Sequence, residues 1–206
     1  MSQEFFGALS GAFVIFSAIP YLIATYRDNR PHLTSWLLWT FIGLAMLLTY
    51  QGSGAGWNII PAIFGATNPL LISLLILWKG GEIDPLEKSD KACIVLCAIS
   101  MAGWVWYAYY GDPEYASYAL LLAIAADGAA AWPTIKKVYR DPMSDKPVSW
   151  LLFSFAWGIN FLALPNWHWS SWILPAWLTA GSLIIAVPLI RYRQKHKIPF
   201  SWSWAI

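Results

Sequence analysis

Long apolar runs, separated by short polar segments, make up most of the chain. Seven of these runs predict helices, over about residues 5–26, 35–50, 57–78, 92–110, 115–139, 148–164 and 171–192. Runs of about 20 apolar residues match the hydrocarbon thickness of a bilayer. Because backbone polar groups in lipid must be satisfied within the spanning segment, these runs favour helices. The pattern therefore predicts an all-α integral membrane protein with seven transmembrane helices.

The amino-acid composition also indicates a membrane protein. Of the 206 residues, 58% are hydrophobic and 12% are charged, and the mean hydropathy is +0.51. A soluble domain carries about 25% charged residues, so an ordinary soluble globule and a disordered chain are both excluded. The net charge of +2 gives no reason to expect a nucleic-acid partner. Residues 1–4 lack the basic segment of a signal peptide, so the first run is expected to remain as a helix.

Positively charged residues occur in only four of the polar segments. The 13 Lys and Arg residues are Arg27, Arg30, Lys79, Lys88, Lys91, Lys136, Lys137, Arg140, Lys146, Arg191, Arg193, Lys195 and Lys197. The other predicted loops, at 51–56, 111–114 and 165–170, contain none. Because basic loops stay on the cytoplasmic side, the N-terminus is predicted outside and the C-terminus in the cytoplasm. We therefore expect a multi-pass protein of the plasma (inner) membrane.

The chain also contains an internal repeat. Residues 19–27 (IPYLIATYR) and 132–140 (WPTIKKVYR) share Pro, Tyr and Arg at an offset of 113. Ser-Trp-Leu-Leu follows in both copies, at 35–38 and 149–152, and Pro-Ala recurs at 61–62 and 175–176, both at an offset of 114. The matches span three helices in order, so they predict two copies of a three-helix unit. The fourth helix restores the orientation, which makes the two repeats parallel.

This 3+1+3 organisation gives the predicted boundaries. The predicted segments are a first three-helix repeat at 5–78, a cytoplasmic linker at 79–91, a linker helix at 92–111, a second three-helix repeat at 115–192 and a cytoplasmic tail at 193–206. The tail is apolar and aromatic after a basic run. It is expected to lie on the inner leaflet or to dock on a partner.

The repeat unit resembles a known superfamily. A proline near the cytoplasmic end of a helix, a basic loop and then Ser-Trp resemble the PQ-loop pattern, and the 3+1+3 plan is similar to that of SWEET-like (MtN3-type) transporters. Tyr21 and Thr134 stand where that pattern usually has Gln. The resemblance implies a transporter of a small polar solute by alternating access, with Pro20 and Pro133 as hinges. A static kink held by packing is the alternative interpretation of these prolines.

One carboxylate falls inside a predicted span. Asp127 lies six residues before Pro133 in an Ala-Gly setting, and Val14 occupies the matching place in the first repeat. A carboxylate within a membrane is costly and normally faces a cavity or a partner. We interpret Asp127 as a proton-coupling or substrate-binding group. The alternative is an acid that is hydrogen-bonded to neighbouring hydroxyls or backbone.

Four further residues are candidates for binding substrate. Asn68 and its repeat mate Ser182 lie near the middle of the third and seventh helices, where SWEET-like transporters carry polar residues that bind substrate. A role for Asn68 in the helix break at Pro69 is the alternative. Trp157 and Asn160 share one face of the sixth helix and could form a pocket wall. Packing of Trp157 opposite Gly43 is the alternative there.

Other chemistry is not indicated by the sequence. The three His residues fall in different polar segments, and no phosphate-binding loop or catalytic pair is visible. We therefore expect no enzyme activity, no metal and no cofactor, and we expect a small-molecule solute and the lipid bilayer as partners.

Two rival functions remain open at this stage. One is a non-transporting scaffold or subunit of a larger membrane complex, which the 15 Trp residues and the apolar tail favour because they could meet other proteins. The other is a ligand-binding membrane receptor. A transporter needs polar residues from both repeats along one central path, whereas a scaffold would fill that path with bulky apolar side chains. The aromatic belt at the membrane interfaces accounts for several Trp residues, including Trp36 and Trp150.

Overall fold

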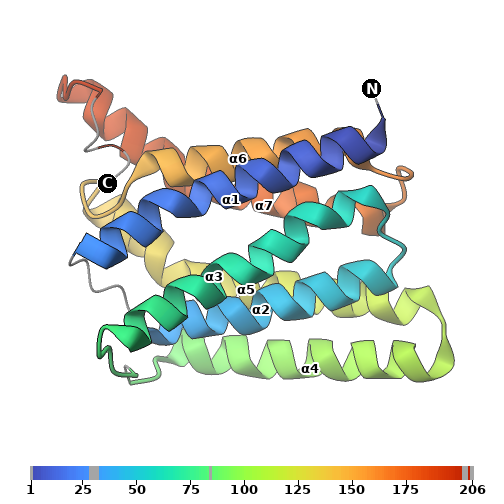
Figure 1. The fold of residues 1–206 in the computed structure, drawn as a ribbon. Helices are drawn as coiled ribbons and strands as arrows, with labels where there is room; N and C mark the ends of the chain where they lie inside the picture. Colours follow the sequence, from blue (N-terminus) through green and yellow to red (C-terminus); the bar gives the residue numbers. More distant parts are fainter. Residues whose placement is uncertain (1, 28–32, 84, 201–203, 205–206) are drawn as a thin grey trace.

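The computed structural model describes residues 2–27, 33–83, 85–200 and 204, which fold into a bundle of helices. The elements, in chain order, are α1 (Gln3–Arg27), α2 (Leu33–Gly52), η1 (Trp57–Ile59), α3 (Ile60–Trp78), α4 (Lys88–Tyr110), α5 (Pro113–Arg140), α6 (Pro147–Asn160), η2 (Phe161–Ala163) and α7 (Trp169–Lys195). Successive α-helices run in opposite directions along the bundle (Figure 1). The prediction of an all-α protein is confirmed.

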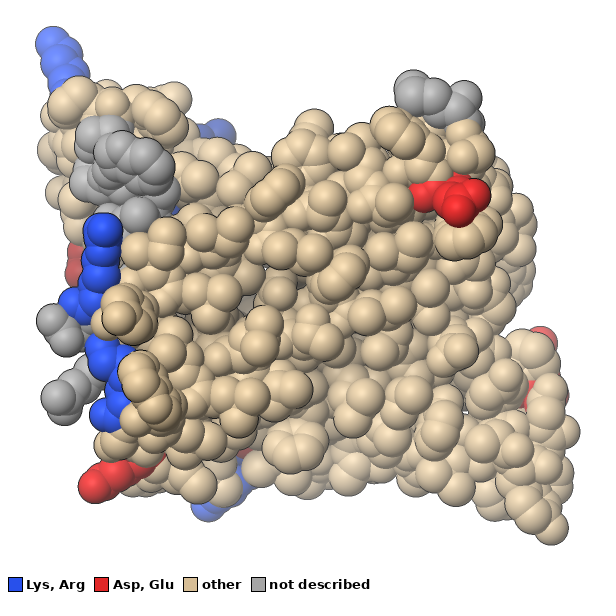
Figure 2. Space-filling view, in the orientation of Figure 1, with Lys and Arg blue, Asp and Glu red and all other residues tan. Residues whose placement is uncertain are grey.

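Six of these helices are long and apolar enough to cross a bilayer, namely α1, η1 with α3, α2, α4, α5 and α7. The helix α6 continues into η2 as a shorter apolar segment, Pro147–Ala163. The protein is therefore a multi-pass membrane protein. Charged side chains collect at the ends of the bundle, and Lys and Arg lie at the end where α1, α3, α5 and α7 finish (Figure 2). We call this the basic end.

Several helix boundaries differ by a few residues from the sequence prediction, and two of the larger differences extend a helix into a polar segment. The helix α4 begins at Lys88, about one turn before the predicted start near Ala92. Its first turn is polar but is stabilised by a capping box, in which Asp90 Oδ2 accepts a hydrogen bond of 2.7 Å from the Glu87 N–H. The helix α7 continues to Lys195, beyond the predicted end near Tyr192. Hydropathy marks apolar positions alone, so it misses helical turns that hydrogen bonds hold in polar surroundings.

The helices pack so that most of the core is shared by α1, α2, α5, α6 and α7. The helix α1 contacts α3 and α6, the helix α2 contacts α3 and α5, and α7 contacts α5 and α6. The central apolar cluster includes Val14, Ile42, Leu120, Ala123 and Trp157. The helix α4 lies at one side of the bundle, against α2 and α5 (Figure 1). This arrangement places α1, α2, α3, α5, α6 and α7 around a common centre.

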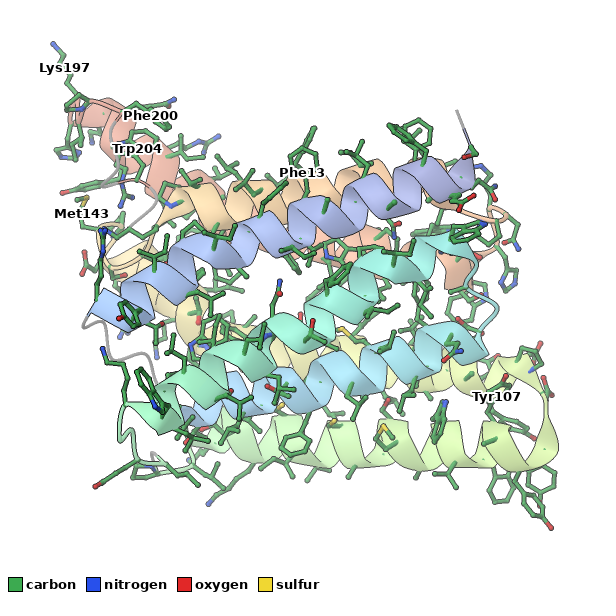
Figure 3. The ribbon with its side chains drawn as sticks, in the orientation of Figure 1. Phe13, Tyr107, Met143, Lys197, Phe200 and Trp204 are labelled. Carbon is green, nitrogen blue, oxygen red and sulfur yellow. The ribbon has the colours of Figure 1, made fainter. Side chains whose placement is uncertain are left out.

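A buried arginine joins the end of α7 to the loop between α5 and α6. Arg193 is only 1% exposed, and its guanidinium donates to the carbonyls of Pro142 at 2.9 Å and of Asp145 at 2.9 Å. The Trp204 ring lies 5.8 Å from the Arg193 Cζ, and Figure 3 shows Trp204 close to this end of the bundle. The tail was expected to lie on the inner leaflet or to dock on a partner. In the structure, Trp204 of the tail lies against Arg193 of the same chain.

Close packing between α2 and α3 depends on a glycine. A Cβ at Gly43 would lie 2.8 Å from the Ala66 Cα and 3.2 Å from the Gly65 carbonyl oxygen. Both are backbone atoms, so they cannot move aside as a flexible side chain can. Small residues at such positions let two membrane helices approach closely.

We predict that Gly43→Ala destabilises the fold by about 1–3 kcal/mol, because the added methyl group forces α2 and α3 apart. Gly158→Ala on α6 is the control, since a Cβ there meets no atom within 4 Å. It should leave stability unchanged or raise it by up to about 1 kcal/mol through helix propensity. Thermal unfolding of the two purified variants in detergent measures the difference. Equal unfolding midpoints would contradict the packing described here.

Candidate functional site

A cavity of about 180 Å³ lies between the six central helices. The side chains that line it come from α1, α2, α3, α5, α6 and α7, and among the described residues none comes from α4. It extends from the middle of the bundle toward the basic end, because its lining includes Trp36 in the first turn of α2 and Ser149 in the first turn of α6. The lining is mainly apolar and aromatic, as is usual for small-molecule sites.

Four aromatic side chains form a closed cluster along the part of the cavity nearest the basic end. The ring centroids are 5.4 Å apart for Tyr21 and Trp36, 5.2 Å for Trp36 and Trp39, 6.4 Å for Trp39 and Trp150, and 6.3 Å for Trp150 and Tyr21. All four contacts are edge-to-face, which is a favourable geometry for aromatic pairs. We call these residues the aromatic cluster. It joins α1 and α2 to α6.

A carboxylate in the loop between α5 and α6 holds this cluster in place. Asp145 Oδ1 accepts a hydrogen bond of 2.7 Å from the Tyr21 hydroxyl, and Asp145 Oδ2 accepts one of 3.2 Å from the Trp150 Nε1–H. The Lys146 backbone N–H also donates to Asp145 Oδ1, at 2.6 Å. One acidic residue therefore connects α1 to the start of α6. Sequence reasoning missed both Asp145 and the aromatic cluster, because it assigned Trp36 and Trp150 to the membrane interface.

The predicted carboxylate, Asp127, lines the cavity from α5. Its Oδ2 accepts a hydrogen bond of 2.8 Å from the Trp177 Nε1–H on α7. The next residue, Gly128, allows this approach, since a Cβ there would lie 3.3 Å from the Trp177 ring. The partner is thus an indole of another helix, and not the neighbouring hydroxyl or backbone group that the sequence offered as the alternative.

Asp127 has no cationic partner among the described residues. No Lys or Arg in that part of the chain lines the cavity, and the described His, Cys, Asp and Glu side chains form no group of three that could hold a metal ion. A single hydrogen bond from Trp177 is the stabilisation that the described residues give this carboxylate. Charged groups within membranes normally pair with one another, so this arrangement is unusual.

Asn68 and Ser182, two of the predicted substrate-binding residues, both line the cavity, and each donates a hydrogen bond to the chain itself. Asn68 Nδ2 donates to the Val14 carbonyl at 2.9 Å, which ties α3 to α1. The Ser182 hydroxyl donates to the Leu178 carbonyl at 2.6 Å, one turn earlier in α7. Ser17 donates to the Val14 carbonyl as well, at 2.6 Å. The hydroxyl hydrogens of Ser17 and Ser182 are therefore used within the chain, whereas the Asn68 amide keeps a second N–H beyond its bond to Val14.

Trp157 and Asn160, which were predicted to form one pocket wall, have different surroundings in the structure. Trp157 is 1% exposed and lines the cavity, and its ring lies beside Gly65, where a Cβ would be 3.9 Å from it. Asn160 is not among the lining residues. Its Nδ2 donates to the Asn58 carbonyl at 3.0 Å, at the end of α6 away from the basic end.

Asn160 belongs to a second group of hydrogen bonds that crosses the bundle. The Asn58 amide donates to the Tyr50 hydroxyl, and that hydroxyl donates to the Ser171 carbonyl at 2.6 Å. Pro175 explains why this carbonyl is available, because proline four residues later has no N–H to donate to it. We call Tyr50, Asn58, Asn160 and Ser171 the far-end network. The sequence signal for it was the proline, which had been noted only as a symmetric pair.

The two predicted hinge prolines lie inside continuous helices. Pro20 is within α1 and Pro133 within α5, and neither lines the cavity. Each leaves one carbonyl of the preceding turn without its helical donor. Pro20 directly precedes Tyr21 of the aromatic cluster, and Pro133 lies between the lining residues Ala131 and Ile135. Both prolines therefore lie next to the half of the cavity nearer the basic end.

Comparison of the chain with protein-family models, with curated proteins and with solved structures finds no match. The resemblance to PQ-loop transporters therefore remains an expectation from sequence. The cavity, its carboxylate and its aromatic walls are the observations from which a function is inferred.

We predict that Tyr21 and Asp145 are energetically coupled. In a double-mutant cycle, Tyr21→Phe and Asp145→Asn should each lower stability, and their combined effect should differ from the sum by about 0.5–3 kcal/mol. Tyr50→Phe with Asp145→Asn is the control pair, because Tyr50 donates to Ser171 in the far-end network. That pair should be additive within about 0.5 kcal/mol. Unfolding in denaturant measures the free energies of the wild type, the two single variants and the double variant in each cycle. An additive Tyr21–Asp145 cycle would exclude the coupling.

Proposed function

We propose that the protein is a membrane transporter that moves a small solute by alternating access through the central cavity. The observation that carries this proposal is that polar side chains from both halves of the chain line one cavity. Ser17 and Asn68 come from α1 and α3, and Asp127 and Ser182 come from α5 and α7. A scaffold has no need of such a cavity, and bulky apolar side chains would fill it.

The proposal includes two parallel three-helix repeats, α1–α3 and α5–α7, joined by α4. The helix contacts support this arrangement. If α1 corresponds to α5 and α2 to α6, the contact of α1 with α6 should have a counterpart between α5 and α2, and both contacts occur. The repeat mates Trp36 and Trp150 also meet in one aromatic cluster through Tyr21 and Trp39. An interface of this kind is expected where two similar units pack around a common axis.

Alternating access requires that each end of the cavity open in turn, and a tie between the repeats crosses the bundle on each side. Toward the basic end, Tyr21 of the first repeat donates to Asp145, in the loop between α5 and α6 of the second. At the other end, Tyr50 of the first repeat donates to Ser171 of the second. Opening one side breaks one tie and leaves the other in place. Pro20 and Pro133, which weaken their helices near the aromatic cluster, are the hinges of this motion.

Asp127 is the coupling group in this proposal. A carboxylate that faces a cavity without a cationic partner in the described residues is able to take up a proton from one side and release it to the other. Because Asp127 lies on α5 and its partner Trp177 on α7, a change in protonation alters a contact between two helices of the same repeat.

We expect Asp127→Asn to abolish the response of uptake to an inward proton gradient, because asparagine keeps the shape of aspartate and loses the titrating group. The measurement is uptake into proteoliposomes of a panel of sugars, amino acids, vitamins and organic cations. Glu114→Gln is the matched control, since it removes an exposed carboxylate from the same helix. Uptake that keeps its gradient dependence in Asp127→Asn would remove Asp127 from coupling. Absence of uptake of every solute by folded protein would favour the scaffold.

The proposed orientation, with the N-terminus outside and the C-terminus in the cytoplasm, makes a separate prediction. In a variant lacking Cys93 and Cys97, a cysteine at Gln51 should react with a membrane-impermeant maleimide added to spheroplasts. A cysteine at Glu82, in the polar segment before α4, should react only after permeabilisation. Gln51 and Glu82 are both exposed. The opposite labelling pattern would invert the orientation.

A further inference from the structure

The chemistry of the cavity narrows the class of solute, and this step rests on the proposed transport function of the same site. The first observation is the imbalance of charge in the cavity. Asp127 contributes a carboxylate, while none of the described lining residues is Lys, Arg or His. A carboxylate removed from water without a counter-ion is costly. An anionic solute would add to that cost, whereas a cationic solute would offset it.

The second observation is the aromatic wall. Five tryptophans line the cavity, which are Trp36, Trp39, Trp150, Trp157 and Trp177. The indole face attracts cations more strongly than the other aromatic side chains, and aromatic walls are the usual way in which proteins bind quaternary ammonium groups. Trp177 also donates its N–H to Asp127, which fixes one indole beside the carboxylate. A cation in this cavity would therefore be surrounded by a carboxylate and several indole rings.

The third observation concerns the hydrogen-bonding groups that a sugar or another polyol would need. Asn68, Ser17 and Ser182 donate to carbonyls of the chain itself, and Tyr21 donates to Asp145. The Ser149 hydroxyl and the Trp157 Nε1 have no partner among the described residues, yet both atoms are covered by surrounding atoms. The hydroxyl hydrogens of Ser17, Ser182 and Tyr21 are thus used within the chain, and the Asn68 amide keeps one N–H for a ligand. Because the buried polar groups of a ligand must be paired, a solute with many hydroxyl groups would leave several of them unpaired here.

We propose that the cavity binds a small organic monocation, a quaternary ammonium or a protonated amine with apolar substituents, through Asp127 and the surrounding tryptophans. The carboxylate supplies the charge and the indoles supply cation–π and apolar contact. Divalent metal ions are a poor fit, since the described His, Cys, Asp and Glu side chains form no group of three or more that could hold one.

The first test compares choline with 3,3-dimethylbutan-1-ol, the neutral molecule in which carbon replaces the ammonium nitrogen. Binding is followed by tryptophan fluorescence and by calorimetry on the wild-type protein in nanodiscs. Benzyltrimethylammonium and a protonated primary amine of similar size extend the panel of cations. We expect the cations to bind at least about tenfold more tightly than their neutral isosteres, as a charge-assisted contact implies. Equal binding of choline and its isostere would overturn the proposal, and this comparison does not depend on the folding of any variant.

Variants then test the residues. Asp127→Asn should weaken cation binding about 10- to 100-fold and leave the neutral isostere unaffected. Trp39→Leu should weaken cation binding about 2- to 30-fold. The controls are Glu114→Gln on the same helix as Asp127 and Trp132→Leu, because Trp132 is 61% exposed and does not line the cavity. Unchanged cation affinity in folded Asp127→Asn would exclude the proposed site.

Binding and uptake together separate this proposal from the transport function. Cation binding that depends on Asp127, without uptake by proteoliposomes, would support the cation site and contradict transport. Uptake of a neutral solute by protein that binds no cation would support transport and overturn the cation site.

Discussion

The lipid surroundings require every polar group inside the bundle to find a partner in the protein, and the rest of the structure depends on how this requirement is met. The Ser10 hydroxyl donates to the Ala156 carbonyl at 2.7 Å and joins α1 to α6. The Ser100 hydroxyl donates to the Ala119 carbonyl at 2.7 Å and joins α4 to α5. Small hydroxyl side chains therefore act as links between helices in a bundle where the hydrophobic effect cannot distinguish one apolar face from another. Asp127 differs from these links, since its one hydrogen bond from Trp177 leaves a carboxylate that faces the cavity with no cationic partner among the described residues.

The two halves meet this requirement differently at corresponding positions, and the difference produces the candidate site. In the first half, the Val14 backbone carbonyl accepts hydrogen bonds from Ser17 and Asn68, so these polar groups are paired with one another. In the second half, under the proposed repeat, Asp127 stands at the position that matches Val14, and Ser182 matches Asn68. Ser182 turns back to its own helix, and Trp177 becomes the partner of the carboxylate. The proposed pair of repeats thus carries a carboxylate at this position in the second half and not in the first.

The positions of the helices could be predicted from the sequence, but the side of each helix that faces the cavity could not, and the reason is physical. Long apolar runs identify spans, and an acid inside such a run is rare enough to mark Asp127 as a candidate. A membrane helix is apolar all round, so its pattern does not reveal which side faces lipid and which faces a cavity. Trp36 and Trp150 were therefore assigned to the membrane interface although they line the cavity. For the same reason Asn160 was grouped with Trp157, whereas it joins the far-end network at the last residue of α6.

The distribution of unsatisfied groups bears on which helix can move in the proposed cycle. Among the described side chains, three of the six buried polar atoms without a hydrogen-bond partner belong to α6: Ser149 Oγ, Trp157 Nε1 and Asn160 Oδ1. Each such group costs about 1–3 kcal/mol relative to a state in which it is paired. These costs raise the free energy of the present arrangement of α6, so the difference from an alternative arrangement is smaller than a fully paired helix would allow. The helix α6 also carries Trp150 of the aromatic cluster, and its last residue, Asn160, joins the far-end network. A displacement of this one short helix would therefore act at once on the aromatic cluster and on the far-end network, as the proposed alternating access requires.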